Sequence, residues 1–215
     1  MKYKLVIFDL DGTILDTVHQ LAVSFNEALK KSGFEPQNPE LIKSRIGNGA
    51  MKLVLRSIEG LENADPDVIR RDYREYYNAH CIENTEEFAG ITDLLKTLKD
   101  NGVMTAVVTN KSDAPARKLC ETKFPGLIDV VKGHREGLPH KPDPVLVNEV
   151  LDEFGISAEE SVMAGDSEVD IATANNAGME CISVTWGYKD RNYLIANGAS
   201  VLVDDPMEIA RIVMG

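Results

Sequence analysis

The chain opens with a short apolar run, residues 5–8, that passes directly into two aspartates, Asp9 and Asp11. Four consecutive large apolar residues predict a strand that is buried on both faces, as in the middle of a parallel sheet. Side chains two positions apart on a strand point to the same face, so the two carboxylates should lie close together. Gly12 and Thr13 then interrupt the strand. Because open α/β sheets bind ligands at the carboxyl ends of their strands, this pair of acids favours a site for a divalent cation such as Mg²⁺.

The acidic composition limits the partners that the chain can have. Its 215 residues include 35 Asp and Glu against 23 Lys and Arg, a formal net charge of −12. Such a surface repels the phosphates of nucleic acids and of anionic membranes, so we expect neither as a partner. A small phosphorylated metabolite would be repelled as well, unless a metal ion, a lysine or a helix N-terminus neutralises its charge locally.

Signals for export or membrane insertion are not found. The first residues enter a strand directly and lack the apolar core of a signal peptide, and no stretch approaches 18 consecutive apolar residues. Three scattered cysteines, without a disulfide or metal-binding spacing, are typical of buried thiols in a reducing compartment. They are Cys81, Cys120 and Cys181. We therefore expect a cytoplasmic protein, either a monomer or a homodimer.

Two patterns of secondary structure divide the chain. Residues 15–86 carry helical signals, such as the spacing of Leu21, Phe25 and Leu29, and no convincing strand. Afterwards strands and helices alternate, which predicts parallel pairing through right-handed crossovers. These strands are expected at residues 104–109, 128–132, 162–164 and 181–185.

The predicted fold class is α/β, a doubly wound parallel sheet with an inserted all-helical cap. The sheet and its helices would be formed by residues 1–14 together with residues 87–215, and the cap by residues 15–86. Because the insert leaves at the carboxyl end of the first strand, it should lie over Asp9 and Asp11.

Three further polar motifs are expected at the same edge of the sheet. Each motif alone has an ordinary structural explanation, namely the end of a strand, a solvated lysine, or an acid that favours a helix N-terminus. Their convergence with Asp9 and Asp11 at the carboxyl ends of the strands instead indicates one active site. The motifs are Thr109 with Asn110, Lys141, and Asp166 with Asp170.

Together with Asp9 and Asp11, these motifs resemble the four motifs of the haloacid dehalogenase superfamily of aspartate-nucleophile phosphotransferases. Their order and spacing match over nearly the whole chain. The resemblance implies a Rossmann-like core, and the helical insert is similar to the C1-type cap of that superfamily. Asp11 favours the members that cleave phosphate esters, since the dehalogenases lack this acid and a halide leaving group needs no proton.

The resemblance also implies a role for each acidic residue. Asp9 would attack phosphorus and form an aspartyl-phosphate, while Asp11 would act first as general acid and then as general base. Asp9, the backbone carbonyl of Asp11, and Asp166 would bind Mg²⁺. Asp170 would support the metal site, directly or through its ligands, or would orient Lys141.

Other residues are implied to bind the transferring phosphoryl group. Thr109 would donate a hydrogen bond to this group, with Asn110 beside it as a second phosphate-binding residue. Lys141 would neutralise the charge of the phosphoryl group and hold Asp9 in place.

The turn at residues 45–50, Arg-Ile-Gly-Asn-Gly-Ala, is similar to the cap loop of phosphoglycolate phosphatases. Backbone N–H groups at the start of a helix suit an anionic group. Arg45, Asn48 and Gly49 would therefore contact the substrate, with a small carboxylate as the group they bind.

The predicted activity is that of a Mg²⁺-dependent phosphatase, a phosphoric monoester hydrolase that acts on a small metabolite, with 2-phosphoglycolate as the leading candidate. Two other enzymes on the same scaffold stay open, a sugar-phosphate mutase of the β-phosphoglucomutase type and a pyrophosphatase. A signalling receiver domain is the alternative from a different class, since receivers also combine acids, Mg²⁺, a threonine and a lysine on a parallel sheet. Receivers are shorter, however, and carry their phospho-acceptor on a middle strand without a helical insert.

Overall fold

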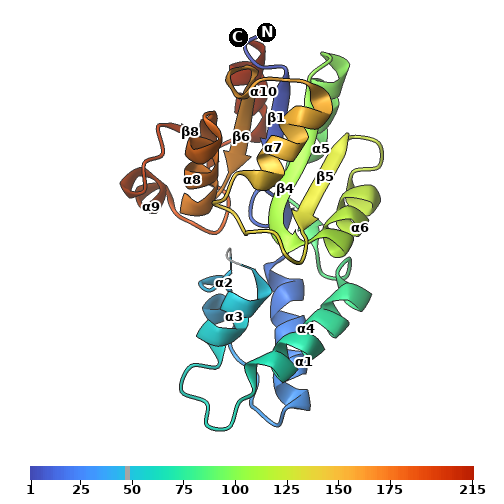
Figure 1. The fold of residues 1–215 in the computed structure, drawn as a ribbon, viewed down its shortest axis with the longest axis vertical. Helices are drawn as coiled ribbons and strands as arrows, with labels where there is room; N and C mark the ends of the chain where they lie inside the picture. The colour runs from blue at the N-terminus through green and yellow to red at the C-terminus, as the bar shows by residue number, and fades with distance from the viewer. Residues whose placement is uncertain (47–48) are drawn as a thin grey trace.

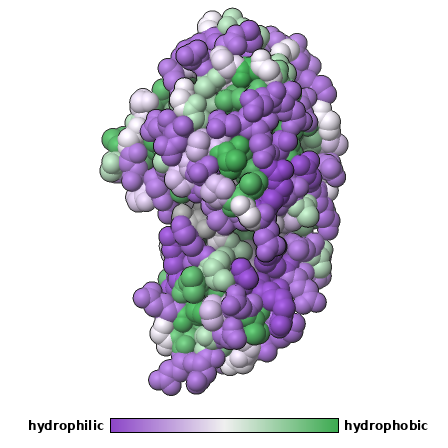
Figure 2. Space-filling model, viewed as in Figure 1, coloured by the Kyte–Doolittle hydropathy of each residue, from purple (hydrophilic) through white to green (hydrophobic). Residues whose placement is uncertain are grey.

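The computed structural model describes residues 1–46 and 49–215. Figure 1 shows two bodies along the long axis, a helix-covered sheet that contains both termini and a group of helices beyond the carboxyl ends of the strands. The face seen in that view is mainly hydrophilic, with apolar side chains in small separate groups (Figure 2). None of the helices in the described ranges combines the length and apolar character needed to cross a bilayer.

In the described part of the chain, one sheet contains six parallel strands: β1 (Leu5–Phe8), β4 (Met104–Ser112), β5 (Val130–His134), β6 (Ser161–Gly165), β7 (Glu180–Val184) and β8 (Val201–Val203). Their order across the sheet is β5-β4-β1-β6-β7-β8. The central strand β1 is buried along its whole length, as its apolar run predicts, and it pairs with β4 on one side and β6 on the other. These neighbours bring their carboxyl ends next to Asp9.

The sheet is covered by α5 (Ile91–Asp100), α6 (Asp113–Lys123), α7 (Val145–Phe154), α8 (Glu168–Ala177), α9 (Arg191–Ala196) and α10 (Pro206–Met214). Alternate residues of β1 point to opposite faces. Leu5 and Ile7 belong to a core cluster with α7 and α8, whereas Val6 and Phe8 belong to one with α5, α6 and α10. Both faces are therefore covered by helices, and the predicted doubly wound α/β class is confirmed.

The second body contains, among the described residues, α1 (Val18–Lys31), α2 (Pro39–Lys43), α3 (Ala50–Ser57) and α4 (Pro66–His80). The side chains of Asn38 and Asp65 cap α2 and α4, and a proline follows each of them at the first helical position. Helix α1 packs on α4 through an edge-to-face contact between Phe25 and Tyr73, whose ring centroids lie 6.2 Å apart.

An antiparallel ribbon connects the two bodies, whereas the sequence predicts no strand in residues 15–86. The two strands have only two residues each, too few to show an alternating pattern. Strand β2 (Leu15–Asp16) pairs with β3 (Glu86–Glu87), with Leu15 opposite Glu87 and Asp16 opposite Glu86. The chain therefore leaves the sheet body and returns to it at one place. The division into residues 1–14, 15–86 and 87–215 stays a prediction.

Four strands of the sheet body differ from the prediction in their bounds, and β8 was not predicted. Strand β6 extends one residue further at each end, and β7 lies one residue earlier than expected. Strand β5 lies two residues later than expected, and β4 continues past Thr109 to Ser112 with an irregular register against β5. The reason is that Ser112 pairs with His134 of β5, so the polar residues after Thr109 do not end β4. This extension places Lys111 at the edge of the sheet that faces the helical body.

Candidate active site

The candidate active site is a cavity of about 250 Å³ that both bodies line. Asp9, Asp11 and Asp166 line it from the sheet body, and residues of α3 and α4 such as Leu53 and Tyr77 line it from the helical body. The three acids meet because β1 and β6 are neighbours in the sheet and both run toward the cavity. A ligand in this cavity would thus touch the strand ends and the helical body at once.

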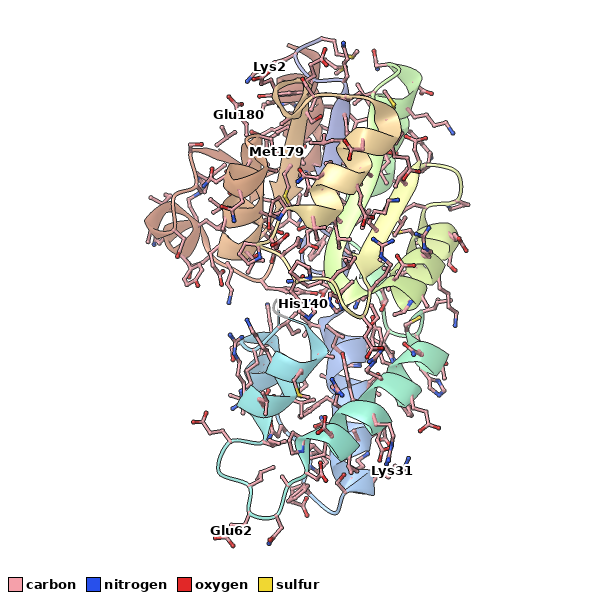
Figure 3. All side chains as sticks on the ribbon, viewed as in Figure 1. Lys2, Lys31, Glu62, His140, Met179 and Glu180 are labelled. Carbon is pink, nitrogen blue, oxygen red and sulfur yellow. The ribbon has the colours of Figure 1, made fainter. Side chains whose placement is uncertain are left out.

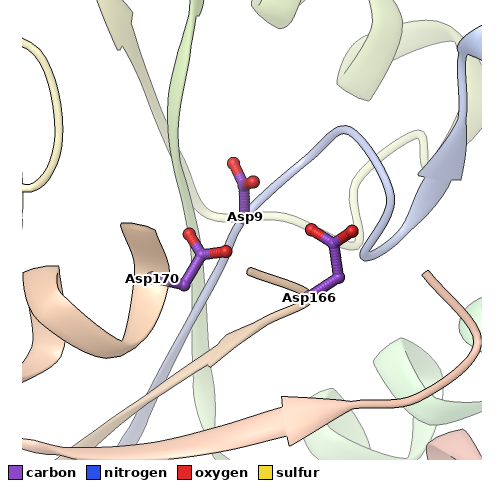
Figure 4. A group of neighbouring side chains, drawn as sticks. All are labelled: Asp9, Asp166 and Asp170. Carbon is purple, nitrogen blue, oxygen red and sulfur yellow. The ribbon is translucent and has the colours of Figure 1, made fainter. Parts of the chain in front are cut away.

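Three carboxylates from separate segments converge beside this cavity. Asp9 follows β1, Asp166 follows β6 and Asp170 lies in the first turn of α8, and one oxygen of each lies within 4.8 Å of the others (Figure 4). Burial raises the pKa of Asp9 to about 6, although the ammonium of Lys141 opposes the shift. Burial, together with the charges of Asp170 and Asp9, also holds the pKa of Asp166 well above its usual range. A nearby cation would therefore favour the ionised form of Asp166.

One such cation is the Lys141 ammonium, which is almost fully buried. Its Nζ lies 2.9 Å from Oδ1 of Asp9 and 2.7 Å from Oδ1 of Asp170, and it donates to the carbonyl oxygen of Val108 at 3.0 Å. Burial alone would lower the pKa of Lys141, but Asp170 and Asp9 outweigh it and raise the pKa. The other oxygen of Asp170 accepts from the backbone N–H and the hydroxyl of Ser167, at 3.1 and 2.7 Å. Asp170 thus fixes the position of the lysine.

Asp11 is ion-paired with a different lysine, Lys111. Its Oδ1 accepts from the hydroxyl of Thr17 at 2.6 Å and lies 2.9 Å from Nζ of Lys111. The same Nζ donates to the hydroxyl of Tyr77 in α4 at 2.8 Å, so the lysine joins the two bodies. No role for Lys111 was predicted from the sequence. The signal available was its place directly after Thr109 and Asn110, at the end of a strand that leads to the site.

Thr109 and Asn110 lie in the last part of β4, before its end at Ser112, and they have different surroundings. Thr109 lines the cavity, and its hydroxyl accepts from the backbone N–H of Lys111 at 3.2 Å. The amide of Asn110 accepts from the backbone N–H of Lys141 at 2.7 Å and donates to the Lys141 carbonyl at 3.2 Å. Asn110 therefore holds the loop that carries Lys141 against β4.

The family of haloacid dehalogenase-like hydrolases matches residues 6–184, a range that includes all of these site residues. The chain belongs to this family. The resemblance inferred from the motifs is thus confirmed for the family and for the fold.

Relatives in the haloacid dehalogenase-like family resemble the chain over most of its length. A phosphoglycolate phosphatase from Pseudomonas putida is 32% identical over 94% of this chain and 76% of its own length. A phosphoglycolate phosphatase from Chromobacterium violaceum is 35% identical over 96% of this chain and 94% of its own. A crystal structure from Lactobacillus delbrueckii subsp. bulgaricus, described provisionally as a phosphoglycolate phosphatase, has 33% identity and a TM-score of 0.93 over 99% of both chains. The predicted enzyme class, a phosphoric monoester hydrolase, agrees with these relatives.

The acids of this family member fit a hard divalent cation. Asp9 and Asp166 offer carboxylate oxygens, the ligands that such ions prefer. Within the described ranges no lysine or arginine is ion-paired with Asp166, although only 3% of the residue is exposed. Its Oδ2 accepts from the backbone N–H of Tyr188 at 2.7 Å, and a Cβ on Gly12, where φ is +84°, would lie 2.3 Å from that oxygen. The backbone thus packs closely around an acid for which the described residues supply no ion-pair partner.

The residues predicted in the cap turn lie in different places. Gly49 lines the cavity, and a Cβ there would lie 2.9 Å from Cε1 of His140, at the junction of the two bodies (Figure 3). The guanidinium of Arg45 donates to Oε1 of Gln37 at 2.9 Å in the helical body, and Arg45 is not part of the cavity wall, so its contact with the substrate stays a prediction. Asn48 lies outside the described residues.

Proposed function

We propose that the protein is a Mg²⁺-dependent phosphatase that hydrolyses a small phosphorylated metabolite, 2-phosphoglycolate in the first place, through an aspartyl-phosphate on Asp9. The observation that carries the proposal is the placement of Asp9. This carboxylate ends the central strand, faces the cavity, and lies within 4.8 Å of two further acids and 2.9 Å from a buried lysine. A nucleophilic carboxylate that attacks a phosphate dianion needs such neutralisation, because like charges otherwise keep the two apart.

Asp9 and Lys141 would act directly on the phosphoryl group. A carboxylate oxygen of Asp9 would form a bond to phosphorus while the bond from phosphorus to the ester oxygen breaks. Lys141 would spread the charge that develops on the phosphoryl oxygens, and Thr109 would donate a hydrogen bond to them. Asp170 would serve as the positioning residue for Lys141, since its oxygens are bound to that lysine and to Ser167.

Asp11 would move the protons. Its carboxyl group would protonate the departing ester oxygen, and would later take a proton from the water that attacks the aspartyl-phosphate and releases Asp9. The contacts of its Oδ1 with Thr17 and Lys111 would set the orientation of the group. Mg²⁺, held by Asp9, Asp166 and the backbone carbonyl of Asp11, would neutralise the phosphate and the acids around it.

Residues 15–86 would act as a cap that closes the site from the side opposite the strand ends. Residues of α3 and α4, including Leu53, Tyr73 and Tyr77, already form part of the cavity wall. A cap that excludes water protects an aspartyl-phosphate from unproductive side reactions and strengthens the electrostatic interactions inside. Since the phosphoglycolate phosphatases from two bacteria match over nearly the whole chain, cap included, 2-phosphoglycolate is the first substrate to test.

Phosphate release from a panel of metabolites tests the proposal. With Mg²⁺, the protein should release many equivalents of phosphate from 2-phosphoglycolate, with a kcat/KM about 10-fold or more above that for hexose phosphates. An isomerised hexose phosphate without free phosphate would indicate a mutase instead, and preferred cleavage of pyrophosphate a pyrophosphatase. Stoichiometric phosphorylation without turnover would indicate a receiver domain.

Thermal unfolding tests the metal site independently of activity. Mg²⁺ at about 100 times its dissociation constant should stabilise the protein by about 2.7 kcal/mol, which corresponds to a rise of roughly 5–10 °C in the unfolding temperature. Asp166→Asn should remove most of this rise, because it replaces a ligand. Glu136→Gln is the matched control, since Glu136 lines the same cavity outside the acidic cluster. An equal rise in the unfolding temperature of both variants would show that Mg²⁺ binds at another site.

A further inference from the structure

We propose that Lys111 binds a carboxylate of the substrate, and that the preferred substrates are phosphate esters of 2-hydroxy acids. The inference rests on the proposed function and deepens it, because it names the residue that recognises the acid group and the chemical class that follows. The contacts of Lys111 with Asp11 and Tyr77 carry it.

The side chain of Lys111 is 5% exposed and forms part of the cavity wall. Its Nζ lies 2.9 Å from Oδ1 of Asp11 and 2.8 Å from the hydroxyl of Tyr77, and 4.5 Å from the centroid of the Tyr77 ring. An ammonium has three N–H donors, and these two oxygens account for two of them in the described structure. The third donor can therefore serve an anion in the cavity while the other two hold the nitrogen in place.

The distance between the ester oxygen and the carboxylate within the substrate then determines which substrates fit the site. Asp11 is the group that would protonate the ester oxygen, and Lys111 is its direct neighbour. In the phosphate ester of a 2-hydroxy acid, a single carbon separates the ester oxygen from the carboxylate carbon. A substrate of this class can therefore place its ester oxygen at Asp11 and its carboxylate at Lys111 at the same time, whereas a longer chain would carry its acid group past the lysine.

Other cations of the cavity wall are less suited to this task. Arg70 is ion-paired with Asp67 at 3.2 Å, and Arg74 is exposed. Lys189 lies 5.2 Å from the centroid of the Tyr193 ring. In the described structure none of the three is ion-paired with Asp11, and only a cation beside Asp11 can reach a carboxylate so close to the ester oxygen.

The test compares two substrates of equal size, 2-phosphoglycolate and its uncharged amide, 2-phosphoglycolamide. Lys111→Met keeps the length of the side chain and removes its charge. It should lower kcat/KM for both substrates, since Lys111 also orients Asp11, but by about 100-fold more for 2-phosphoglycolate than for the amide, because only 2-phosphoglycolate loses a hydrogen bond between charged groups. Arg74→Gln, the matched loss of a cation in the same cavity, should change both values by less than about 3-fold.

The outcomes distinguish a Lys111 that binds the substrate carboxylate from a Lys111 that only positions Asp11. An equal loss on both substrates would mean that Lys111 only positions Asp11, and no loss on either would mean that the carboxylate binds elsewhere; both overturn the proposal. Lys111→Arg should recover part of the selectivity, because it restores the charge. Turnover of the amide reports that the variant is folded, and Lys111→Gln is the second variant should the first one fail to fold.

Inhibition of the wild-type protein gives a measurement that needs no variant. Glycolate, the expected product, should inhibit hydrolysis of 2-phosphoglycolamide at lower concentrations than glycolamide does, since only glycolate carries the acid that Lys111 binds. Equal inhibition by the two would overturn the proposal. If the wild type cleaves the amide as well as it cleaves 2-phosphoglycolate, the phosphatase assignment stands and the Lys111 assignment falls. If it cleaves no phosphate ester at all, the proposed function itself fails.

Discussion

Asp9→Asn is expected to abolish turnover, with a loss of at least about 10⁴-fold in kcat, because an amide cannot serve as the nucleophile that forms the aspartyl-phosphate. The substitution preserves the shape of the side chain and keeps an oxygen near Nζ of Lys141, which lies 2.9 Å from Oδ1 in the wild type. Phosphate release from 2-phosphoglycolate and from p-nitrophenyl phosphate measures the effect. Retained activity on either substrate would remove Asp9 from the reaction.

The same variant should be at least as stable as the wild type when no divalent cation is present. Burial raises the pKa of Asp9 to about 6 in the folded protein. The folded protein therefore loses stability as the pH rises through about 6 and Asp9 ionises, and it regains this stability as the pH falls and Asp9 binds a proton. Asn carries no charge at any pH. The variant should therefore unfold at a higher temperature than the wild type at about pH 7.5, and the difference should shrink as the pH falls through about 6 toward 4.

Asp100→Asn is the matched control for that comparison, because Asp100 is exposed at the end of α5, in the sheet body. Its unfolding temperature should follow that of the wild type over the whole pH range. A wild type that is more stable than Asp9→Asn at every pH would contradict the unfavourable burial of the Asp9 charge.

Lys141→Met is expected to reduce both stability and activity. It leaves Asp9 and Asp170 without the buried ammonium that lies 2.9 and 2.7 Å from their Oδ1 atoms. Removal of one partner from a buried ion pair costs about 3–5 kcal/mol, because an uncompensated charge stays behind. Activity should fall by about 10²–10³-fold or more, since the cation that would neutralise the phosphoryl group is lost. Urea unfolding at neutral pH measures the free energy of unfolding.

Lys132→Met is the control that shows whether the loss of a lysine at another ion pair has the same effect. Lys132 lies on β5 and is ion-paired with Glu153 at 2.6 Å, in a more exposed position. It should cost about 0–1 kcal/mol. The double variant with Lys141→Met and Asp170→Asn should be more stable than the sum of the single changes predicts, by about 0.5–3 kcal/mol, because the two residues interact directly. Strict additivity would show that this contact contributes nothing to stability.

The sequence carries enough information for the sheet body and for most of the acids at its edge. A strand with apolar side chains on both faces, such as residues 5–8, indicates a sheet that is covered by helices on both sides. Acids directly after such a strand are expected at its carboxyl end, where these sheets bind ligands. Asp9 and Asp166 could therefore be placed in one site from chain order alone. Their carboxylates, with that of Asp170, have oxygens within 4.8 Å of one another in the structure.

Contacts between the two bodies could not be predicted in this way. Lys111 reads as one more polar residue after a strand, and its significance appears only when Tyr77, 34 positions away in the chain, is brought to its Nζ. Arg45 lies in a turn whose sequence favours anion binding, yet its guanidinium donates a hydrogen bond to Gln37 in the helical body. The local sequence shows which residue types a segment offers. Which partner a long side chain contacts depends on how helices distant in the chain pack together.

The β2–β3 ribbon has a consequence for how such a protein can change during evolution. Leu15 and Asp16 lie opposite Glu87 and Glu86, so the entry and the exit of the helical segment are neighbours in space. Segments of other lengths and topologies could be spliced between these two points without altering the strand order of the sheet or the positions of the acids at its edge. Reaction chemistry and substrate choice would then diversify independently, each encoded by its own stretch of the gene.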